Sequence, residues 1–238
     1  MINKIKQNCG DVLIILGKSD KKVRNRYYYK GYFEGYTKVI NFRLDIAQRG
    51  NVKNPDKPDK YGFLCDEKNT NSHIYYVWKN MERKCYYPEC SEYNLYGGKG
   101  IKVSNEFKTY SKFKNWYIIN SNGDFSLDLD KDCKCIVDNI PKIYSSETCM
   151  LLPPEINTFI STIGKGIYNT KFNTYCVRLR RVYKKINKNF KTLSEAIAYK
   201  KAEDINYLKI LINKHSLKEE TKKYLEKYVE IFEYPSNL

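Results

Sequence analysis

The chain has 238 residues, 42% of them hydrophobic, and no apolar run long enough to span a bilayer. Lysines and arginines number 43 against 27 acids, and the resulting net charge of +16 favours a polyanionic partner. We therefore expect a protein that does not span a membrane. With no export signal, the eight cysteines are expected to be reduced thiols in a cytoplasmic protein.

Residues 1–66 are expected to form a small β-rich unit. Strands are predicted at Val12–Leu16, Asn25–Tyr32 and Thr37–Leu44, with a turn at Gly17–Asp20 after the first. The consecutive tyrosines Tyr27–Tyr29 place rings on both faces of one strand, so at least one ring should be exposed. The unit is either an accessory DNA-contacting module or a packing module.

Two helices and a glycine-rich loop are predicted next. Apolar residues at helical spacing predict a helix over His73–Lys84, with Trp78 in the core. The segment Tyr96–Ile101 reads YGGKGI, and its glycines allow the backbone to approach a ligand closely. Lys99 in this loop suits a phosphate, and an ordinary tight turn is the alternative. A second helix is predicted over Phe107–Ile119.

An acidic segment follows, and its order of elements is distinctive. If Leu127–Cys133 is extended, alternation directs three carboxylates to one face: Asp128, Asp130 and Asp132. Such a row must face bulk water or a cation, so it is a candidate edge of a hard-metal site. A turn at Asp138–Pro141, an apolar run at Cys149–Leu152 and a short helix opened by Pro153 and Pro154 come next. The predicted order is strand, loop, strand, helix.

Three short motifs in this segment carry a resemblance to a known family. The chain reads LDKD, YSSETC and PEIN at Leu129–Asp132, Tyr144–Cys149 and Pro154–Asn157. Together with YGGKGI, these resemble the phage-borne HNH (ββα-metal) homing endonucleases, whose chains read LDKD, YSPETC and P.EIN. The resemblance implies an HNH-like domain over residues 67–162 that uses a divalent metal, Mg²⁺ or Mn²⁺.

The resemblance also implies roles for individual residues. Asp130 and Asn157 fall on the metal-ligand positions, and Asp130 with Lys131 would form the catalytic pair. Lys131 stands where most active members have a histidine general base, and Thr148 stands where they have an asparagine that braces the loop. A histidine titrates near neutrality and suits water activation, whereas a lysine does not unless its surroundings change its proton affinity.

Residues 163–238 are expected to form a sheet-plus-helix unit. The segments Gly166–Tyr168, Tyr175–Tyr183 and Lys184–Phe190 predict a three-stranded antiparallel sheet. A helix over Ser194–Ile212, with Thr192 or Ser194 as its N-cap, and a final helix over Lys218–Phe232 complete the unit.

This unit resembles the ethylene-response-factor (apetala-type) DNA-binding domain, in which the sheet lies in the major groove. The cations expected to contact DNA are Arg178 and Arg180 on one strand face, with Arg181, Lys184, Lys185 and Lys188 around the turn. A solvated basic hairpin is the alternative.

The sequence therefore predicts an α+β protein with three parts and two competing functions. The first is an HNH-like endonuclease that nicks or cleaves DNA with a divalent metal. The second is a catalytically inactive HNH-like protein that binds nucleic acid, as a regulator or as a blocker of a host machine. DNA is the expected partner, and RNA stays open.

Overall fold

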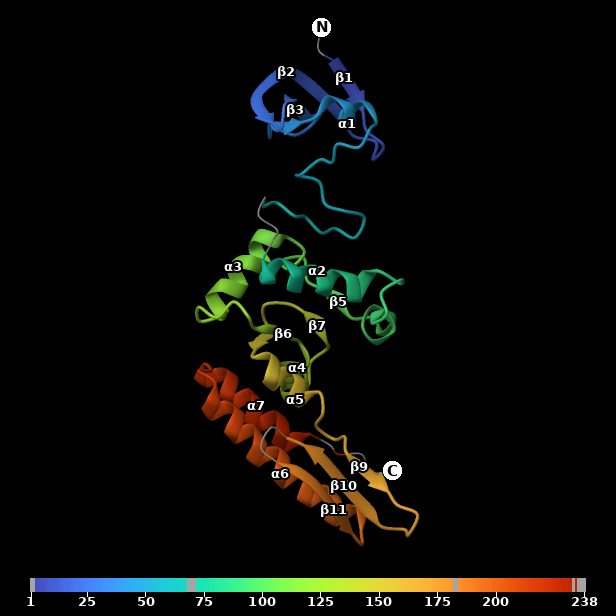
Figure 1. The fold of residues 1–238 in the computed structure, drawn as a ribbon, viewed down its shortest axis with the longest axis vertical. Coiled ribbons are helices and arrows are strands. Elements are labelled where there is room, and N and C mark those ends of the chain that lie inside the picture. The colour runs from blue at the N-terminus through green and yellow to red at the C-terminus, as the bar shows by residue number, and fades with distance from the viewer. Residues whose placement is uncertain (1–2, 68–71, 182–183, 233, 235–238) are drawn as a thin grey trace. The chain divides into compact units, whose positions relative to one another are not determined.

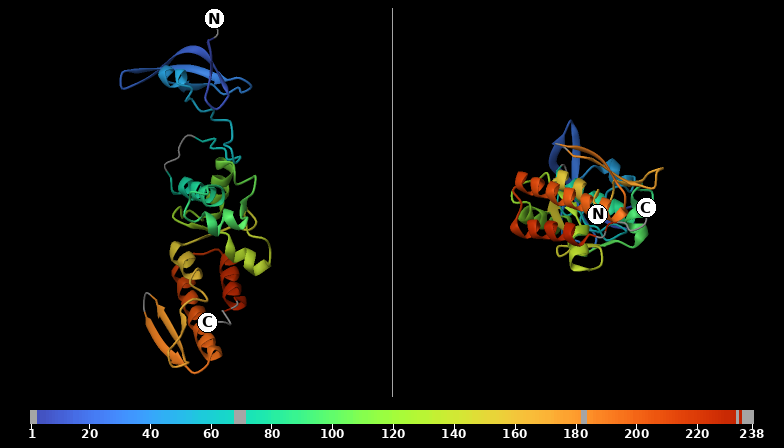
Figure 2. Two further views of the ribbon diagram at one scale, coloured as in Figure 1. Left: turned by 90° about the vertical axis from the view of Figure 1, so that its right-hand side faces the viewer. Right: turned by 90° about the horizontal axis from the view of Figure 1, so that it is seen from below.

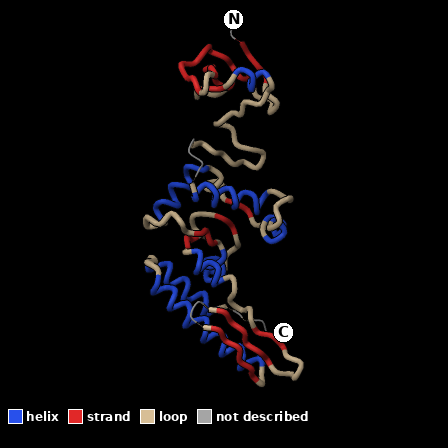
Figure 3. Tube along the Cα trace, in the orientation of Figure 1, coloured by secondary structure: helices blue, strands red, loops and turns tan. Residues whose placement is uncertain are grey.

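A computed structural model of the chain describes residues 3–67, 72–181, 184–232 and 234 (Figure 1). The fold is mixed α+β, which confirms the predicted class. The chain divides into two compact units, Met1–Lys68 with Lys108–Ser111 and Asn69–Phe107 with Lys112–Leu238. Strands dominate the first unit and helices the second (Figure 3). Among the described residues, no helix is both long and apolar enough to cross a membrane.

The first unit is an antiparallel four-stranded sheet in the order β1-β2-β3-β4, with one short helix. Its elements are β1 (Asn3–Lys6), β2 (Val12–Val23), β3 (Arg26–Phe33), β4 (Ile40–Phe42) and α1 (Leu44–Gln48). A small core joins helix and sheet through five buried side chains: Leu13, Phe33, Phe42, Ala47 and Val52. The β-rich character predicted for this part of the chain is confirmed.

The turn predicted at Gly17–Asp20 is wrong. Strand β2 continues to Val23, and the chain reverses at Arg24 and Asn25, which have positive φ angles of 45° and 61°. Gly17, with φ 145°, instead lies at a register shift where β2 bulges against β3. A glycine between two apolar segments marks either a turn or a bulge, and sequence alone does not separate them.

The second unit begins with helices packed on aromatic side chains. Its first elements are α2 (His73–Tyr86), the 3₁₀ turns η1 (Tyr93–Leu95) and η2 (Gly97–Lys99), β5 (Lys102–Val103) and α3 (Tyr110–Asn120). Ser72 caps α2 by accepting a hydrogen bond from the amide of Tyr75. Trp78 is buried, and its Nε1 donates to the carbonyl of Phe107 at 2.7 Å. The predicted helix and its core tryptophan are confirmed.

The centre of the second unit contains two short strand pairs and two short helices. The elements are β6 (Asp128–Asp130), α4 (Asp132–Asp138), β7 (Ile143–Tyr144), β8 (Met150–Leu152) and α5 (Pro154–Ile160). Strands β6 and β8 pair antiparallel, whereas β5 and β7 pair parallel. The predicted extended segment Leu127–Cys133 is wrong beyond Asp130, because Asp132 begins a helix. The three carboxylates therefore do not form one row on a strand.

The C-terminal sheet is antiparallel in the order β11-β10-β9, and one long helix packs on it. Its elements are β9 (Ile167–Asn169), β10 (Tyr175–Arg180), β11 (Lys185–Phe190), α6 (Leu193–Lys214) and α7 (Glu219–Ile231). Thr192 is the N-cap of α6, in a reciprocal capping box with Glu195. The predicted sheet and both helices are confirmed. The predicted strand end at Val182 and Tyr183 lies outside the described residues, as do the domain ends at 1–2 and 235–238.

One hydrophobic core runs through the segments 67–162 and 163–238. Buried residues of α4, β8 and α5 pack there with buried residues of α6 and α7, among them Cys133, Leu152, Ile156, Leu208, Leu211, Leu225 and Tyr228. The two helices α6 and α7 lie side by side in both orientations of the ribbon (Figures 1 and 2). Helix α7 therefore braces the central elements, as expected from its apolar stripe.

Candidate functional site

The central elements place two predicted site residues at one pocket. Strand β6 pairs with strand β8, and helix α5 directly follows β8, although α4 and β7 lie between the two strands in the chain. Pro154 occupies the first turn of α5. Asn157 lies one turn into this helix, and its Nδ2 donates to Oδ2 of Asp128 at 3.2 Å. The side-chain partner of Asn157 is therefore Asp128, whereas the resemblance pairs it with Asp130.

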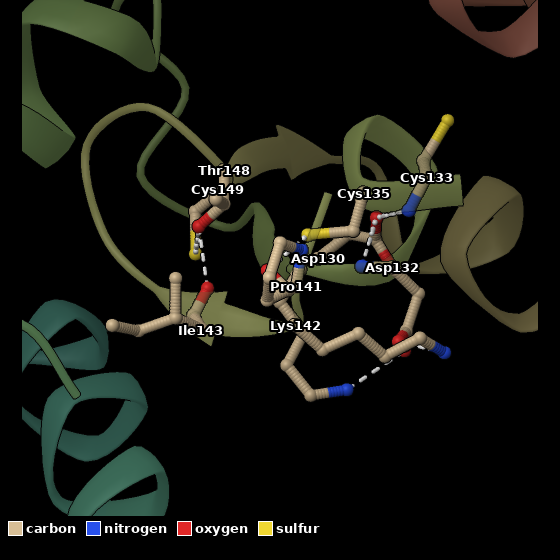
Figure 4. Close-up of polar contacts among 10 residues, drawn as sticks. Asp130, Asp132, Cys133, Cys135, Pro141, Lys142, Ile143, Thr148 and Cys149 are labelled. Carbon is tan, nitrogen blue, oxygen red and sulfur yellow. Dashed lines mark hydrogen bonds and ion pairs between the residues drawn. The ribbon is translucent and has the colours of Figure 1, made fainter. Parts of the chain in front are cut away.

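Asp130 caps helix α4. Its Oδ1 accepts hydrogen bonds from the amides of Cys133 at 2.8 Å and Asp132 at 3.1 Å (Figure 4). Two otherwise unpaired donors at the start of the helix are satisfied in this way. The residue is only 6% exposed, and burial raises the pKa of its carboxyl to about 6, against the lowering effect of the Cys133 amide. This local capping explains why the strand ends at Asp130.

Lys131, the predicted general base, is a buried cation. Its residue is 5% exposed, and its Nζ lies 2.8 Å from Oδ2 of Asp132. The same ammonium lies 4.6 Å from the ring centroid of Tyr96 and 5.7 Å from that of Tyr144. A carboxylate and two aromatic faces attract an ammonium, whereas a general base must act as the free amine. The surroundings of Lys131 therefore suit a structural cation.

Asp132 completes this cluster from the first turn of α4. Its Oδ1 also pairs with Nζ of Lys142 at 2.8 Å, so one carboxylate forms ion pairs with two ammonium groups (Figure 4). These two ion pairs hold the pKa of Asp132 below its ordinary value, although burial opposes them.

Thr148 braces the loop between β7 and β8. Its Oγ1 donates to the carbonyl of Ile143, as Figure 4 shows, and lies 2.9 Å from Oγ of Ser145. Ser145 Oγ in turn accepts from the amide of Thr148 at 3.2 Å. A threonine thus closes this loop locally, at the position where the resemblance expects an asparagine.

The pocket around these residues does not fit a divalent cation. It encloses about 580 Å³, and Asp130, Asp132 and Asn157 are among the residues that line it. Four lysines line it as well: Lys84, Lys131, Lys142 and Lys165. Within the described ranges, no three or more His, Cys, Asp or Glu side chains are grouped to hold a metal ion. Mg²⁺ and Mn²⁺ need converging oxygen donors. Here Oδ1 of Asp130 caps α4, and the carboxylate of Asp132 pairs with Lys131 and Lys142.

The second group of predicted site residues lies on the C-terminal sheet. Helix α6 covers one sheet face through Val177, Leu179 and Ile186. The opposite face, called the outer face below, exposes six side chains in the pairing register: Tyr168, Arg178, Arg180, Lys185, Asn187 and Asn189. Arg178 lies opposite Asn187, and Arg180 lies opposite Lys185. The guanidinium of Arg178 lies 5.9 Å from the ring centroid of Tyr168.

The other predicted DNA-contacting residues do not share the outer face. Arg181 turns inward to an ion pair with Asp204, between the rings of Phe159 and Tyr207. Lys188 lies on the helix side of the sheet, with its Nζ 4.5 Å from the ring centroid of Tyr199.

The remaining two lysines are exposed elsewhere. Nζ of Lys184 lies 3.2 Å from Oε1 of Glu203 on α6. Lys99 lies on η2 directly before Gly100, whose φ of 79° confirms that the loop needs a glycine there. Lys99, Lys131 and Lys142 all line a second hollow of about 500 Å³ beside this loop.

Sequence reasoning missed several residues that the structure brings to these sites. Tyr168, Asn187 and Asn189 join the outer face, and strand alternation combined with the antiparallel register would have placed them there. Tyr96 and Tyr144 stack with ring centroids 6.5 Å apart beside Lys131, and no sequence signal indicates that contact.

Comparisons of the chain with models of known families, with curated proteins and with solved structures found no match.

Proposed function

We propose that the protein binds duplex DNA through the outer face of the β9–β11 sheet, on a nuclease-like framework that has no working metal site. The observation that supports this proposal is that the side chains of Arg178, Arg180 and Lys185 all lie on the same exposed face of the sheet. Among the described residues, none of the three forms an ion pair with a carboxylate. Cations without an internal counter-charge remain available to phosphates.

The chemistry of the outer face suits both parts of DNA recognition. Arginines bind phosphates and also pair with guanine edges, whereas asparagine amides pair with adenine edges in the major groove. Arg178 and Asn187 lie opposite each other on neighbouring strands, so both kinds of side chain are presented together. The net charge of +16 adds long-range attraction to any polyanion. In this proposal the protein acts in the cytoplasm of the host cell.

The proposal is tested by titrating the full chain against a duplex DNA library at several salt concentrations. Arg178→Ala should weaken binding about tenfold and reduce the slope of log K against log salt by about one. Lys223→Ala on the exposed side of α7 removes the same charge away from the sheet and should leave the slope unchanged. Equal effects of the two substitutions would mean that binding depends on net charge and not on the outer face. Tighter binding to RNA than to DNA would identify RNA as the partner instead.

A second candidate is the metal-dependent nuclease. The observation that favours it is the ββα order, in which Asn157 borders both the hollow that contains Asp128 and the pocket that contains Asp130. Supercoiled plasmid incubated with Mg²⁺ or Mn²⁺ separates the candidates. We expect no nicking above a no-protein control, and metal-dependent nicking that Asp130→Ala and Asn157→Ala both abolish would establish the nuclease instead.

A further inference from the structure

The hairpin of β2 and β3 extends well past the core of the first unit. The buried residues of this hairpin that belong to the core, Leu13 and Phe33, pair near its open end. From Asp20 to Tyr27 every residue is exposed. The two strands can be followed in blue at the N-terminal part of Figure 2. The hydrophobic core of this unit therefore does not stabilise the half of the hairpin next to the turn, called the far half below, which includes residues 20–27.

The far half is held in shape by its turn and by its cross-strand pairs. Arg24 and Asn25 form a two-residue reversal with positive φ, which matches the twist of paired strands. Val23 then pairs with Arg26, and Lys22 with Tyr27. The register shifts between Lys18 and Lys22, where β2 bulges against β3, and antiparallel pairing resumes in the two pairs next to the turn.

Cations and aromatic rings alternate along this ribbon. The ring of Tyr27 is flanked by the ammonium groups of Lys22 and Lys18, at 5.0 Å and 5.6 Å from its centroid. Lys21 lies 5.1 Å from the ring centroid of Tyr28. Tyr27 itself is 58% exposed, so one large ring is presented to solvent between two positive charges.

The charge of the ribbon is nearly all of one sign. It contains Lys18, Lys21, Lys22, Arg24, Arg26 and Lys30 against one acid, Asp20. Asp20 pairs with Lys30 at 2.8 Å. Among the described residues, the other five cations have no ion pair with a carboxylate. Packing so many like charges at one tip is unfavourable unless a polyanion binds there.

We infer that the β2–β3 hairpin is a second DNA-binding element, which inserts between the phosphate backbones of a duplex independently of the C-terminal sheet. A two-stranded ribbon fits the width of the major groove. The lysines of β2 and Arg26 of β3 would then reach the flanking phosphates. Tyr27 would lie against sugar or base edges between those contacts. This inference rests on the proposed DNA binding and adds a separate contact in the first unit.

The test compares two triple variants of the full chain that lose the same charge. Lys18→Gln, Lys22→Gln and Arg26→Gln together neutralise the hairpin, whereas Lys6→Gln, Arg49→Gln and Lys53→Gln neutralise exposed cations elsewhere in the first unit. Affinity for one duplex is measured by fluorescence anisotropy across a salt series. The hairpin variant should bind at least tenfold more weakly, with a salt slope smaller by about two to three, since each lost phosphate contact changes it by about 0.9. The control variant should change the slope by less than one.

Failure of this inference can be told apart from failure of the proposed function. If the wild type does not bind DNA, both fall. If Arg178→Ala weakens binding and the hairpin variant matches its control, only the hairpin inference is overturned. Circular dichroism on each variant checks that the sheet is intact, and Tyr27→Ser offers a variant that keeps every charge. If Tyr27→Ser weakens binding to single-stranded DNA but not to duplex DNA, the assignment of the hairpin to duplex binding is overturned.

Discussion

The central pocket and the outer face of the C-terminal sheet both gather cations, yet they use them in opposite ways. In the pocket, Lys131 and Lys142 face Asp132, and Lys84 pairs with Glu92 at 2.9 Å. On the outer face, Arg178 and its neighbours meet no carboxylate among the described residues. The density of lysine and arginine in a sequence therefore does not identify a nucleic-acid surface. The decisive property is whether the fold already supplies the counter-charge.

The largest expected effect concerns a place where two enclosed cations, Arg181 and Lys200, share one buried carboxylate, Asp204. Asp204 is buried and accepts hydrogen bonds from Arg181, from Lys200 and, at 2.8 Å, from the hydroxyl of Tyr234. Asp204→Asn leaves two enclosed cations without a counter-charge, so urea unfolding should show a loss of about 3–5 kcal/mol.

Glu203→Gln is the matched control for Asp204→Asn, because Glu203 pairs with the exposed Lys184 at 3.2 Å. It should reduce the free energy of unfolding by less than about 1 kcal/mol. Similar losses in the two variants would contradict the distinction between enclosed and solvated charges.

The next prediction concerns how the contribution of Asp130 to stability changes with pH. Its folded pKa of about 6 lies above the ordinary value of 3.8, so the native state binds the proton more tightly than the unfolded chain does. The stabilisation is complete below pH 4 and is lost as pH rises through 6. Asp130→Asn keeps the cap and cannot ionise. It should exceed the wild type in stability by up to about 3 kcal/mol at pH 7 and match it near pH 4.

Chemical denaturation at several pH values measures this difference. Repeating the pH 7 measurement with millimolar Mg²⁺ also examines the metal question. Mg²⁺ that stabilises the wild type but not Asp130→Asn would show that the carboxylate binds the ion, contrary to the geometry of the pocket.

A smaller effect is expected at the cluster beside Asp130. Asp132→Ala removes the partner of the enclosed Lys131 and should destabilise the protein by about 1–2 kcal/mol, less than at Asp204 because Asp132 is partly solvated. Lys142→Ala removes the outer ion pair, in which Lys142 is exposed, and should change stability by less than about 0.5 kcal/mol. Thermal unfolding of both variants provides the comparison. A larger loss of stability in Lys142→Ala than in Asp132→Ala would mean that the outer ion pair with Lys142, and not the enclosed pair with Lys131, stabilises the cluster.

The smallest effect concerns the ring under Arg178. Tyr168→Ala removes a cation–π contact and should weaken DNA binding by about 0.5–1 kcal/mol without changing the salt slope, since no charge is lost. Tyr76→Ala, at an exposed ring of α2, is the control and should bind as the wild type does. A change in slope would indicate that Tyr168 itself positions a phosphate contact.

Long periodic elements and the N-cap of α6 were predictable from the sequence, whereas the capping role of Asp130 and the tertiary side-chain partners were not. The helix predicted over His73–Lys84 ends two residues later, at Tyr86. The prediction was this close because apolar residues at helical spacing specify the buried face. The segment after Leu127 has two readings, because alternating Asp residues fit both a strand and a capped helix start. The capping contact of Asp130 with Cys133 decided between them.

The residues of the candidate sites also differ in how far the sequence predicts their positions. Arg178 and Arg180 could be placed on one strand face by alternation alone. The inward turn of Arg181 depends on Asp204 in a distant helix, and the pairing of Asn157 with Asp128 depends on how α5 packs beside β6. Such contacts follow from tertiary packing, which no local pattern encodes.

The core shared by α4, β8, α5, α6 and α7 has a consequence for synthesis on the ribosome. Cys133, Leu152 and Ile156 emerge long before Leu225 and Tyr228, which cover them in the finished fold. At ordinary translation rates this delay lasts on the order of several seconds. During that interval the nascent chain presents an uncovered apolar surface, so premature termination ahead of α7 would release a fragment prone to aggregation and to capture by chaperones.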